Sequence, residues 1–259
     1  MSDDIVAISG NPNWLADVSS EDSSMESLAE HRILPRVKVI QSLSEQSLKD
    51  QFGEGAAILA PGNGLACKRG EYFDFVPLFF FNEFIKWADL NDSGSPSIME
   101  RTFDAASPTA IKARNPTNRE EDYGQGFTAR YQDHLNYCGV IYGDSPLAGT
   151  ACVLGFTRGE FYKGKEFASA LFLRKVDGKQ APLWSMVWRF MPAFREKGSY
   201  KWFGLDFCNP PEGSLYIKED EATPMREEHL NLRKEFENRK LAVDLTETTG
   251  ETTGESTEM

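Results

Sequence analysis

Apolar and polar residues alternate along several stretches of the chain, a period that is typical of half-buried strands. Between residues 33 and 39, Ile33, Val37 and Val39 alternate with basic and polar neighbours, and Pro35 places this strand at the edge or the start of a sheet. Further strands are predicted for apolar runs bounded by Gly, Pro or an Asp-Gly turn. These runs are residues 56–60, 73–87, 134–143, 150–156, 167–176 and 200–207.

The run at 73–87 is the most apolar of these strands. Phe79, Phe80 and Phe81 follow one another, and successive side chains of a strand point to opposite faces. The sequence therefore predicts a central strand that is covered on both faces, with these rings in the core.

Two stretches before the C-terminal region carry helix signals. Ser44 is a candidate cap for a short helix over 44–52 that ends at Gly53. Pro182 stands where a first helical residue would, and apolar residues such as Trp184 and Trp188 recur at helical spacing over 182–194. The second helix is apolar on two stripes, so its tryptophans are expected to be core rather than base-stacking platforms.

A C-terminal helix is predicted within 219–244, because Thr223 can cap it and Pro224 suits its first position. Together these patterns predict an α+β, β-rich fold. Its core is expected to be an OB-like barrel or an antiparallel sheet, followed by the C-terminal helix.

Acidic residues are concentrated at the two ends of the chain. The net charge is −12, yet residues 1–30 hold seven acids and no Lys or Arg, and residues 245–259 hold four glutamates and no base. Residues 219–244 hold eight acids and five bases, so residues 31–218 carry 21 acids and 23 bases. We expect a core domain at 31–218 and disordered acidic segments at 1–30 and 245–259, which either compete for a binding groove and recruit partners or only confer solubility.

Several classes of protein lack support in the sequence. No run approaches the roughly 18 apolar residues of a membrane span, and the N-terminus does not have the layout of a secretory signal. Both observations favour a cytoplasmic protein. If the protein is phage-encoded, this is the cytoplasm of the host. The four cysteines form no C-x-x-C pair and have no histidine at zinc-finger spacing, so free thiols without metal or cofactor are expected, and a zinc site assembled from distant positions is the alternative.

Catalytic motifs are also absent or incomplete. Residues 159–166 fit the phosphate-loop spacing, but Glu166 stands where Ser or Thr would bind magnesium, so a basic, aromatic hairpin loop is the preferred interpretation. His134 and Cys138 are four residues apart in a predicted strand, which favours a core cysteine near a surface histidine over a nucleophile pair. No enzyme is predicted.

The stretch from Cys152 to Phe207 repeatedly places a cation beside an aromatic ring, and the turn-rich stretch at 91–130, a candidate functional loop, repeats the theme. Rings can stack on bases and cations can contact phosphates, although the same rings could fill a core. The candidate nucleic-acid-binding residues are Arg114, Arg119, Tyr123, Arg158, Phe161, Tyr162, Lys163, Lys165, Lys201 and Trp202.

The segments ILPRVKVIQSLSEQ and VPLFFFNEFIKW, within residues 33–90, resemble the opening of a group of largely uncharacterised tailed-phage proteins. This resemblance implies a phage origin and a place near DNA metabolism, and it assigns no catalytic residue. A β-rich, slightly basic body with an acidic C-terminus is also similar in layout to phage and bacterial single-stranded DNA-binding proteins with an oligonucleotide-binding barrel. Their tails commonly finish on an aromatic residue, whereas this chain ends Glu258-Met259.

The leading hypothesis is a single-stranded DNA-binding protein of phage DNA replication or recombination that has no sequence preference. Its acidic tail would recruit replication proteins, and a homo-oligomer is compatible with this function. DNA or RNA remains open as the ligand. One alternative is a protein-interaction or inhibitory factor that acts on a host protein and could mimic DNA, and another is a virion or scaffold component.

Overall fold

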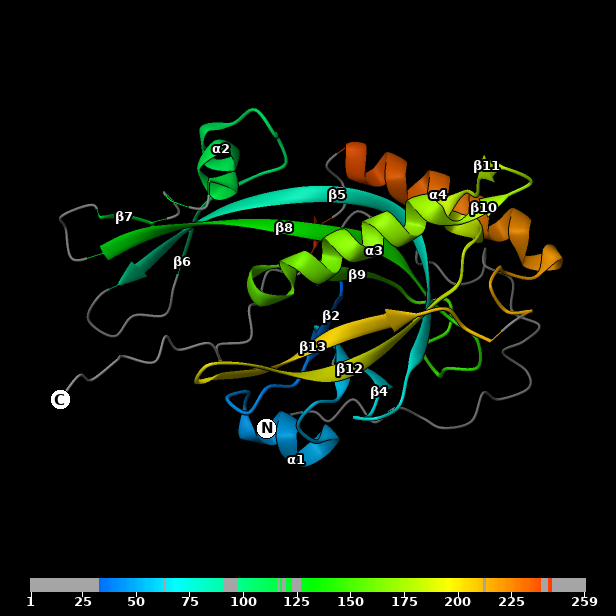
Figure 1. Ribbon diagram of the computed structural model, residues 1–259, viewed down its shortest axis with the longest axis horizontal. Helices are drawn as coiled ribbons and strands as arrows, with labels where there is room; N and C mark the ends of the chain where they lie inside the picture. Colours follow the sequence, from blue (N-terminus) through cyan, green and yellow to red (C-terminus); the bar gives the residue numbers. More distant parts are fainter. Residues whose placement is uncertain are drawn as a thin grey trace, which may run out of the picture.

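The computed structural model describes residues 33–243, except 63, 91–96, 116, 118–119, 123–126, 212 and 239–241. The acidic segments predicted at 1–30 and 245–259 lie outside these residues. The described chain is α+β and strand-rich, as predicted, and one large mixed sheet organises it (Figure 1).

The large sheet has ten strands in the order β13-β12-β5-β8-β9-β2-β3-β4, with β6 added to β5 and β7 added to β8. Neighbours are antiparallel except β2 and β9, which run parallel. The strand bounds are β2 Arg36–Val39, β3 Ala57–Ala60, β4 Gly64–Cys67, β5 Phe73–Leu90, β6 Ser97–Thr102, β7 Glu120–Asp122, β8 Phe127–Tyr142, β9 Ala151–Phe156, β12 Trp188–Lys197 and β13 Tyr200–Cys208.

Two short strand pairs stand apart from the large sheet. β1 (Ile33–Leu34) pairs in parallel with β14 (Ala242–Val243), and β10 (Lys175–Val176) forms a hairpin with β11 (Lys179–Gln180). The predicted turn at Asp177-Gly178 closes this hairpin, with positive φ angles of 50° and 76°.

The described part of the sheet does not close into a barrel. Its edge strand β13 approaches β2, but the link between them is a side chain, because the Gln41 amide donates to the Phe203 carbonyl at 2.8 Å and accepts from the Phe203 N–H at 2.8 Å. The expected sheet core is therefore correct, whereas no closed OB-like barrel is formed.

Helices cover both faces of the sheet (Figure 1). α3 (Phe161–Leu173) packs Phe167 and Leu171 into the larger core cluster, and the Tyr137 hydroxyl of β8 donates to the Gly164 carbonyl at 2.8 Å. α4 (Ala222–Glu237) covers the opposite face through Leu232. The shorter helices are α1 (Gln46–Phe52) and α2 (Pro108–Arg114), with single turns η4 (Arg158–Glu160), η5 (Leu183–Ser185) and η6 (Glu219–Glu221).

The strand predicted at 73–87 is the central strand β5, which pairs with β8 along nearly its whole length. Phe79 and Phe81 are buried, and Phe80 on the other face is half exposed and contacts the Tyr137 ring at 5.1 Å. The prediction of a core strand is confirmed, with Phe80 only partly covered.

The helix predicted at 182–194 is wrong. Only the single turn η5 forms there, and Trp188 begins the strand β12. Within β12, Trp188, Phe190 and Pro192 are buried on one face, which is the period of a strand. Pro192 has no N–H and would break a helix interior, and the run of apolar residues masked the period of two.

The strand predicted at 167–176 and the hairpin loop predicted at 159–166 are also wrong, because both regions belong mainly to α3. Gly164, Phe167 and Leu171 recur at helical spacing and form its buried face. Gly164 allows the close approach, since a Cβ there would lie 2.7 Å from the Phe156 side chain.

The remaining differences concern boundaries and loops. The stretch 91–130 contains β6, α2, β7 and the start of β8, so it is not one long loop. α1 ends at Gly53 as predicted, but the Ser44 hydroxyl accepts from the Gln41 N–H instead of capping the helix. The predicted C-terminal helix is confirmed as α4, which begins one residue before Thr223.

Candidate nucleic-acid interface

The chain leaves the sheet after β9 and forms a turn that fixes the start of α3. In this turn the Glu160 carboxylate accepts hydrogen bonds from Trp202 Nε1 at 2.8 Å, Arg195 Nε at 3.3 Å and the Leu205 N–H at 3.3 Å. Gly204 makes room for this carboxylate, because a Cβ at Gly204 would lie 2.1 Å from it. The first turn of α3 is therefore held against β13.

Ion pairs continue from this anchor. Arg195 binds Asp206 through two nitrogens, at 2.8 and 3.2 Å, and Lys163 Nζ lies 2.7 Å from Glu166 and 3.4 Å from Asp206. The hydrogen bond from Arg195 lowers the pKa of Asp206, and the hydrogen bond to Glu166 raises the pKa of Lys163. We call the set Glu160, Lys163, Arg195, Trp202 and Asp206 the Glu160 cluster.

The ring-and-cation residues of the sequence come together around this anchor. The Trp202 ring packs on Gly159, because a Cβ added at Gly159 would lie 3.0 Å from the ring. The beginning and the end of the stretch from Cys152 to Phe207 therefore meet here. Tyr162 is 71% exposed, and Lys165 lies 4.8 Å over the Phe161 ring. Arg158 and Lys201 are exposed as well.

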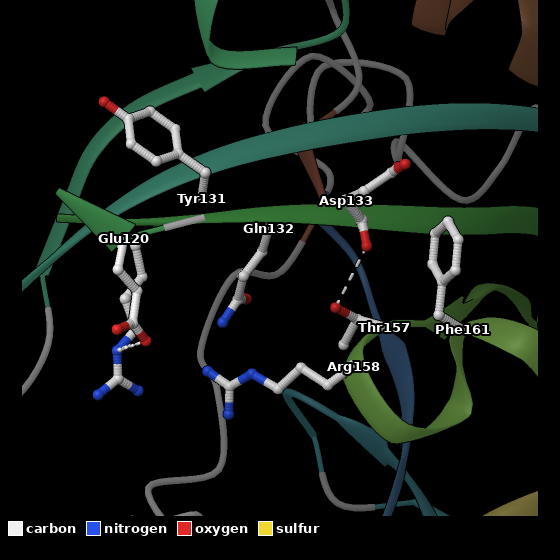
Figure 2. Close-up of a pocket in the computed structure, with 8 residues that line it drawn as sticks. Glu120, Tyr131, Gln132, Asp133, Thr157, Arg158 and Phe161 are labelled. Atoms are coloured by element: carbon white, nitrogen blue, oxygen red, sulfur yellow. Dashed lines mark hydrogen bonds and ion pairs between the residues drawn. The ribbon is translucent and has the colours of Figure 1, made fainter. Parts of the chain in front are cut away.

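A pocket of about 180 Å³ adjoins this turn (Figure 2). It lies at a stretch of the β8 edge between β7, which pairs with residues 128–130, and β9, which pairs with residues 135–140. The Thr157 hydroxyl donates to the Asp133 carbonyl there at 3.3 Å. The residues that line the pocket are Glu120, Arg130, Tyr131, Gln132, Asp133, Thr157, Arg158 and Phe161.

Arg158 links the turn to the pocket. Its side chain extends toward Gln132 in Figure 2, and its φ angle of 49° is uncommon for a residue other than Gly. Such backbone conformations persist where the surrounding structure fixes them, and they cluster at functional sites. Arg130 adds a second guanidinium, whose Nε lies 3.5 Å from Glu120.

The other predicted residues are not part of this surface. Arg114 lies at the end of α2, where its guanidinium stacks 4.7 Å over the Phe84 ring and donates to the Ala105 carbonyl at 3.3 Å. Arg119 and Tyr123 lie outside the described residues. Gln132 was not predicted, because the prediction relied on cations beside rings and Gln132 is neither; Arg130 lies at the end of the stretch 91–130 that was predicted as a functional loop.

A second group of charged residues lies within the sheet, and we call it the Glu83 cluster. Glu83 is fully buried, and its carboxylate lies 2.6 Å from Arg36, 2.5 Å from Arg101 and 3.0 Å from the Asn136 amide. Burial acts to raise the pKa of Glu83, but the guanidiniums of Arg36 and Arg101 outweigh it and hold the pKa below its usual value.

His134 pairs with Glu83 across the two central strands. It is buried, which corrects the prediction of a surface histidine, and it shares a 3.2 Å hydrogen bond with Gln132. Burial lowers the pKa of His134 to about 4, so the imidazole is neutral near pH 7. Cys138 is a buried cysteine on β8 that forms no disulfide with another described residue, as predicted for a core cysteine.

Comparisons with known proteins place the chain in a phage family. A family model described as Pam3 phage gp34-like protein matches residues 6–220, which is most of the chain, and the chain belongs to this family. Neither the curated proteins nor the solved structures contain a match. Within the described residues, the helices are too short or too polar to cross a membrane.

Proposed function

We propose that this member of the Pam3 phage gp34-like family binds single-stranded nucleic acid, with no sequence preference, in phage DNA replication or recombination. The observation that carries the proposal is the arrangement of Arg158, Phe161, Tyr162 and Lys165 on one fixed turn beside a pocket that holds a second guanidinium. We define these four residues, with Arg130 and Gln132, as the turn surface.

Each group of the turn surface suits one part of a nucleotide. Arg158 and Lys165 offer donors to phosphates, Tyr162 offers an exposed ring to a base, and Gln132 borders the pocket with an amide. Arg130 is paired with Glu120, whose side chain is 67% exposed, so this ion pair is weak. The Glu160 cluster fixes the turn before a ligand arrives, which reduces the entropy lost on binding.

Fluorescence anisotropy with a labelled oligo-dT tests the proposal. Binding should weaken steeply as salt rises, and Tyr162→Ala should lower affinity about 5- to 100-fold because a stacked base contributes roughly 1–3 kcal/mol. Phe172→Ala is the matched control, since Phe172 lies on the same helix and is 72% exposed against 71% for Tyr162. Absence of binding at low salt, or equal losses in both variants, would refute this function.

We also propose that the acidic C-terminal tail competes with nucleic acid for the turn surface and recruits replication proteins. The tail carries four glutamates, which can occupy the same cations as phosphates. A chain truncated after Leu245 should then bind oligo-dT more tightly than the full chain at low salt. Equal affinities would show that the tail does not compete.

A second candidate function, interaction with a host protein, is favoured by the other end of α3. Phe172 and Leu173 are 72% and 80% exposed there, and the last turn of the helix holds no basic residue. Exposed apolar side chains side by side are typical of protein-binding surfaces. If oligo-dT does not bind, this candidate becomes the leading one, and a virion component would reveal itself as large stable oligomers in light scattering.

A further inference from the structure

Arg101 on β6 is held by a buried partner and retains unused donors. Its Nε lies 2.5 Å from the fully buried Glu83 carboxylate, so the side chain is fixed at one nitrogen. Within the part of the chain that the structure describes, its two terminal amino groups donate no hydrogen bond. The guanidinium is therefore oriented in advance, with donors left for an anion.

An exposed aromatic ring accompanies this guanidinium. Arg101 lies 4.9 Å over the Phe103 ring, and Phe103 is 44% exposed. The edge-on contacts of Phe103 with Phe81, at 5.8 Å, and with Phe236 of α4, at 5.2 Å, fix the ring in place. Arg101 and Phe103 thus form a rigid pair of a cation and a ring.

The strand register places this pair near the pocket. Ile85 of β5 pairs with Gln132 on one side and with Arg101 on the other, so the three side chains share one face of the sheet. Strands lie about 4.8 Å apart, so Gln132 and Arg101 are separated by roughly 10 Å. Ile85 and Gln132 are both buried, so a ligand would contact the Arg101 end of this row directly and reach the Gln132 end only through the pocket.

We propose that Arg101 and Phe103 form a second contact for the single strand that the turn surface binds, with a phosphate at Arg101 and a base at Phe103. This inference rests on the proposed function and extends its site from the start of α3, past the β8 edge, to Arg101 of β6 and Phe103 on the face that α4 covers. The separation of roughly 10 Å between Gln132 and Arg101 is shorter than a strand of the roughly 4–16 nucleotides that one oligonucleotide-binding domain covers.

Two variants test the second contact with an oligo-dT of about 20 nucleotides. Phe103→Leu keeps apolar bulk against Phe81 and Phe236 but removes the stacking ring, so affinity should fall about 5-fold or more. Arg101→Gln removes one phosphate contact, so the slope of log affinity against log salt should become shallower by about 0.7. A loss of stability alone would not change this slope in the molecules that remain folded, and melting curves confirm the folded fraction.

The matched control is Phe172→Leu, the same substitution at an exposed ring on α3, which should leave affinity unchanged. Ultraviolet crosslinking should also attach the oligonucleotide to the peptide that contains Phe103. Suppose that Tyr162→Ala weakens binding, but that Phe103→Leu keeps the affinity of the unsubstituted chain and Arg101→Gln keeps its salt slope. The proposal of a second contact is then wrong, and the proposal of the turn surface stands. If the unsubstituted chain binds no oligonucleotide, both proposals are wrong.

Discussion

The Glu83 cluster and the Glu160 cluster both join carboxylates to basic side chains, but they differ in burial and in the ratio of charges. In the Glu83 cluster one fully buried carboxylate is shared by Arg36 and Arg101. In the Glu160 cluster, which is partly exposed, two carboxylates serve Arg195 and Lys163. A cation beside a ring in the sequence is therefore not sufficient evidence of a phosphate contact, because an acidic side chain nearby in the fold can already bind the cation.

The largest expected effect is on stability, from Glu83→Gln. Loss of the buried charge leaves two guanidiniums with a weaker acceptor, and breaking a buried ion pair from one side costs about 3–5 kcal/mol. Glu160→Gln is the matched substitution, and it should cost only about 1–2 kcal/mol because water reaches that site.

Urea denaturation of the two variants measures this difference as a change in the free energy of unfolding. Equal losses, or a larger loss for Glu160→Gln, would show that burial does not separate the two clusters in the way the structure indicates.

A smaller effect is expected from pH, and it should arise in the Glu83 cluster. His134 is surrounded by Glu83 and by the guanidiniums of Arg36, Arg101 and Arg158, and burial lowers its pKa to about 4 from a usual value of 6.5. The unfolded chain therefore binds a proton between pH 6.5 and 4 that the folded chain excludes, so stability should fall by about 1–3 kcal/mol as pH decreases through this window.

The titration has an internal comparison, because Asp206 in the Glu160 cluster has a pKa below its usual 3.8 and contributes only at more acidic pH. Thermal melting as a function of pH should show the slope in the unsubstituted chain and lose most of it in His134→Gln. An unchanged slope in that variant would assign the effect to other groups.

The smallest expected effect separates two lysines of α3 in oligo-dT binding. Lys165 is exposed over the Phe161 ring, whereas Lys163 is paired with Glu166 and Asp206. Lys165→Ala should therefore weaken binding about 2- to 5-fold and reduce the salt slope by about 0.7, while Lys163→Ala should change neither. Anisotropy at several salt concentrations distinguishes the two, and a larger effect at Lys163 would contradict the pairing.

The local patterns predicted the strands that are bounded by clear turns, but they did not distinguish a buried strand from a helix where a run of apolar residues fits both. The central strand β5 and the strands around Cys138 and Cys152 were predicted because their apolar runs are bounded by clear turns. The region of Phe167 to Leu173 was misassigned as a strand, because a run of apolar residues fits a buried strand and a helix equally well. For the same reason, Trp188 and Phe190 were predicted to lie in a helix, although they belong to the strand β12.

The sequence by itself determined which elements needed burial, the β-rich class of the fold, the C-terminal helix and the segment from Arg158 to Lys165 as a candidate surface. Hydrophobic periodicity and turn residues carry this information locally. Only the tertiary structure decided which cations are occupied or oriented by acids, because Lys163 meets Asp206, and Arg101 is held at one nitrogen by Glu83, through folding rather than through their position in the chain. Charge pairs across a sheet depend on strand register, and strand register depends on how the whole core packs.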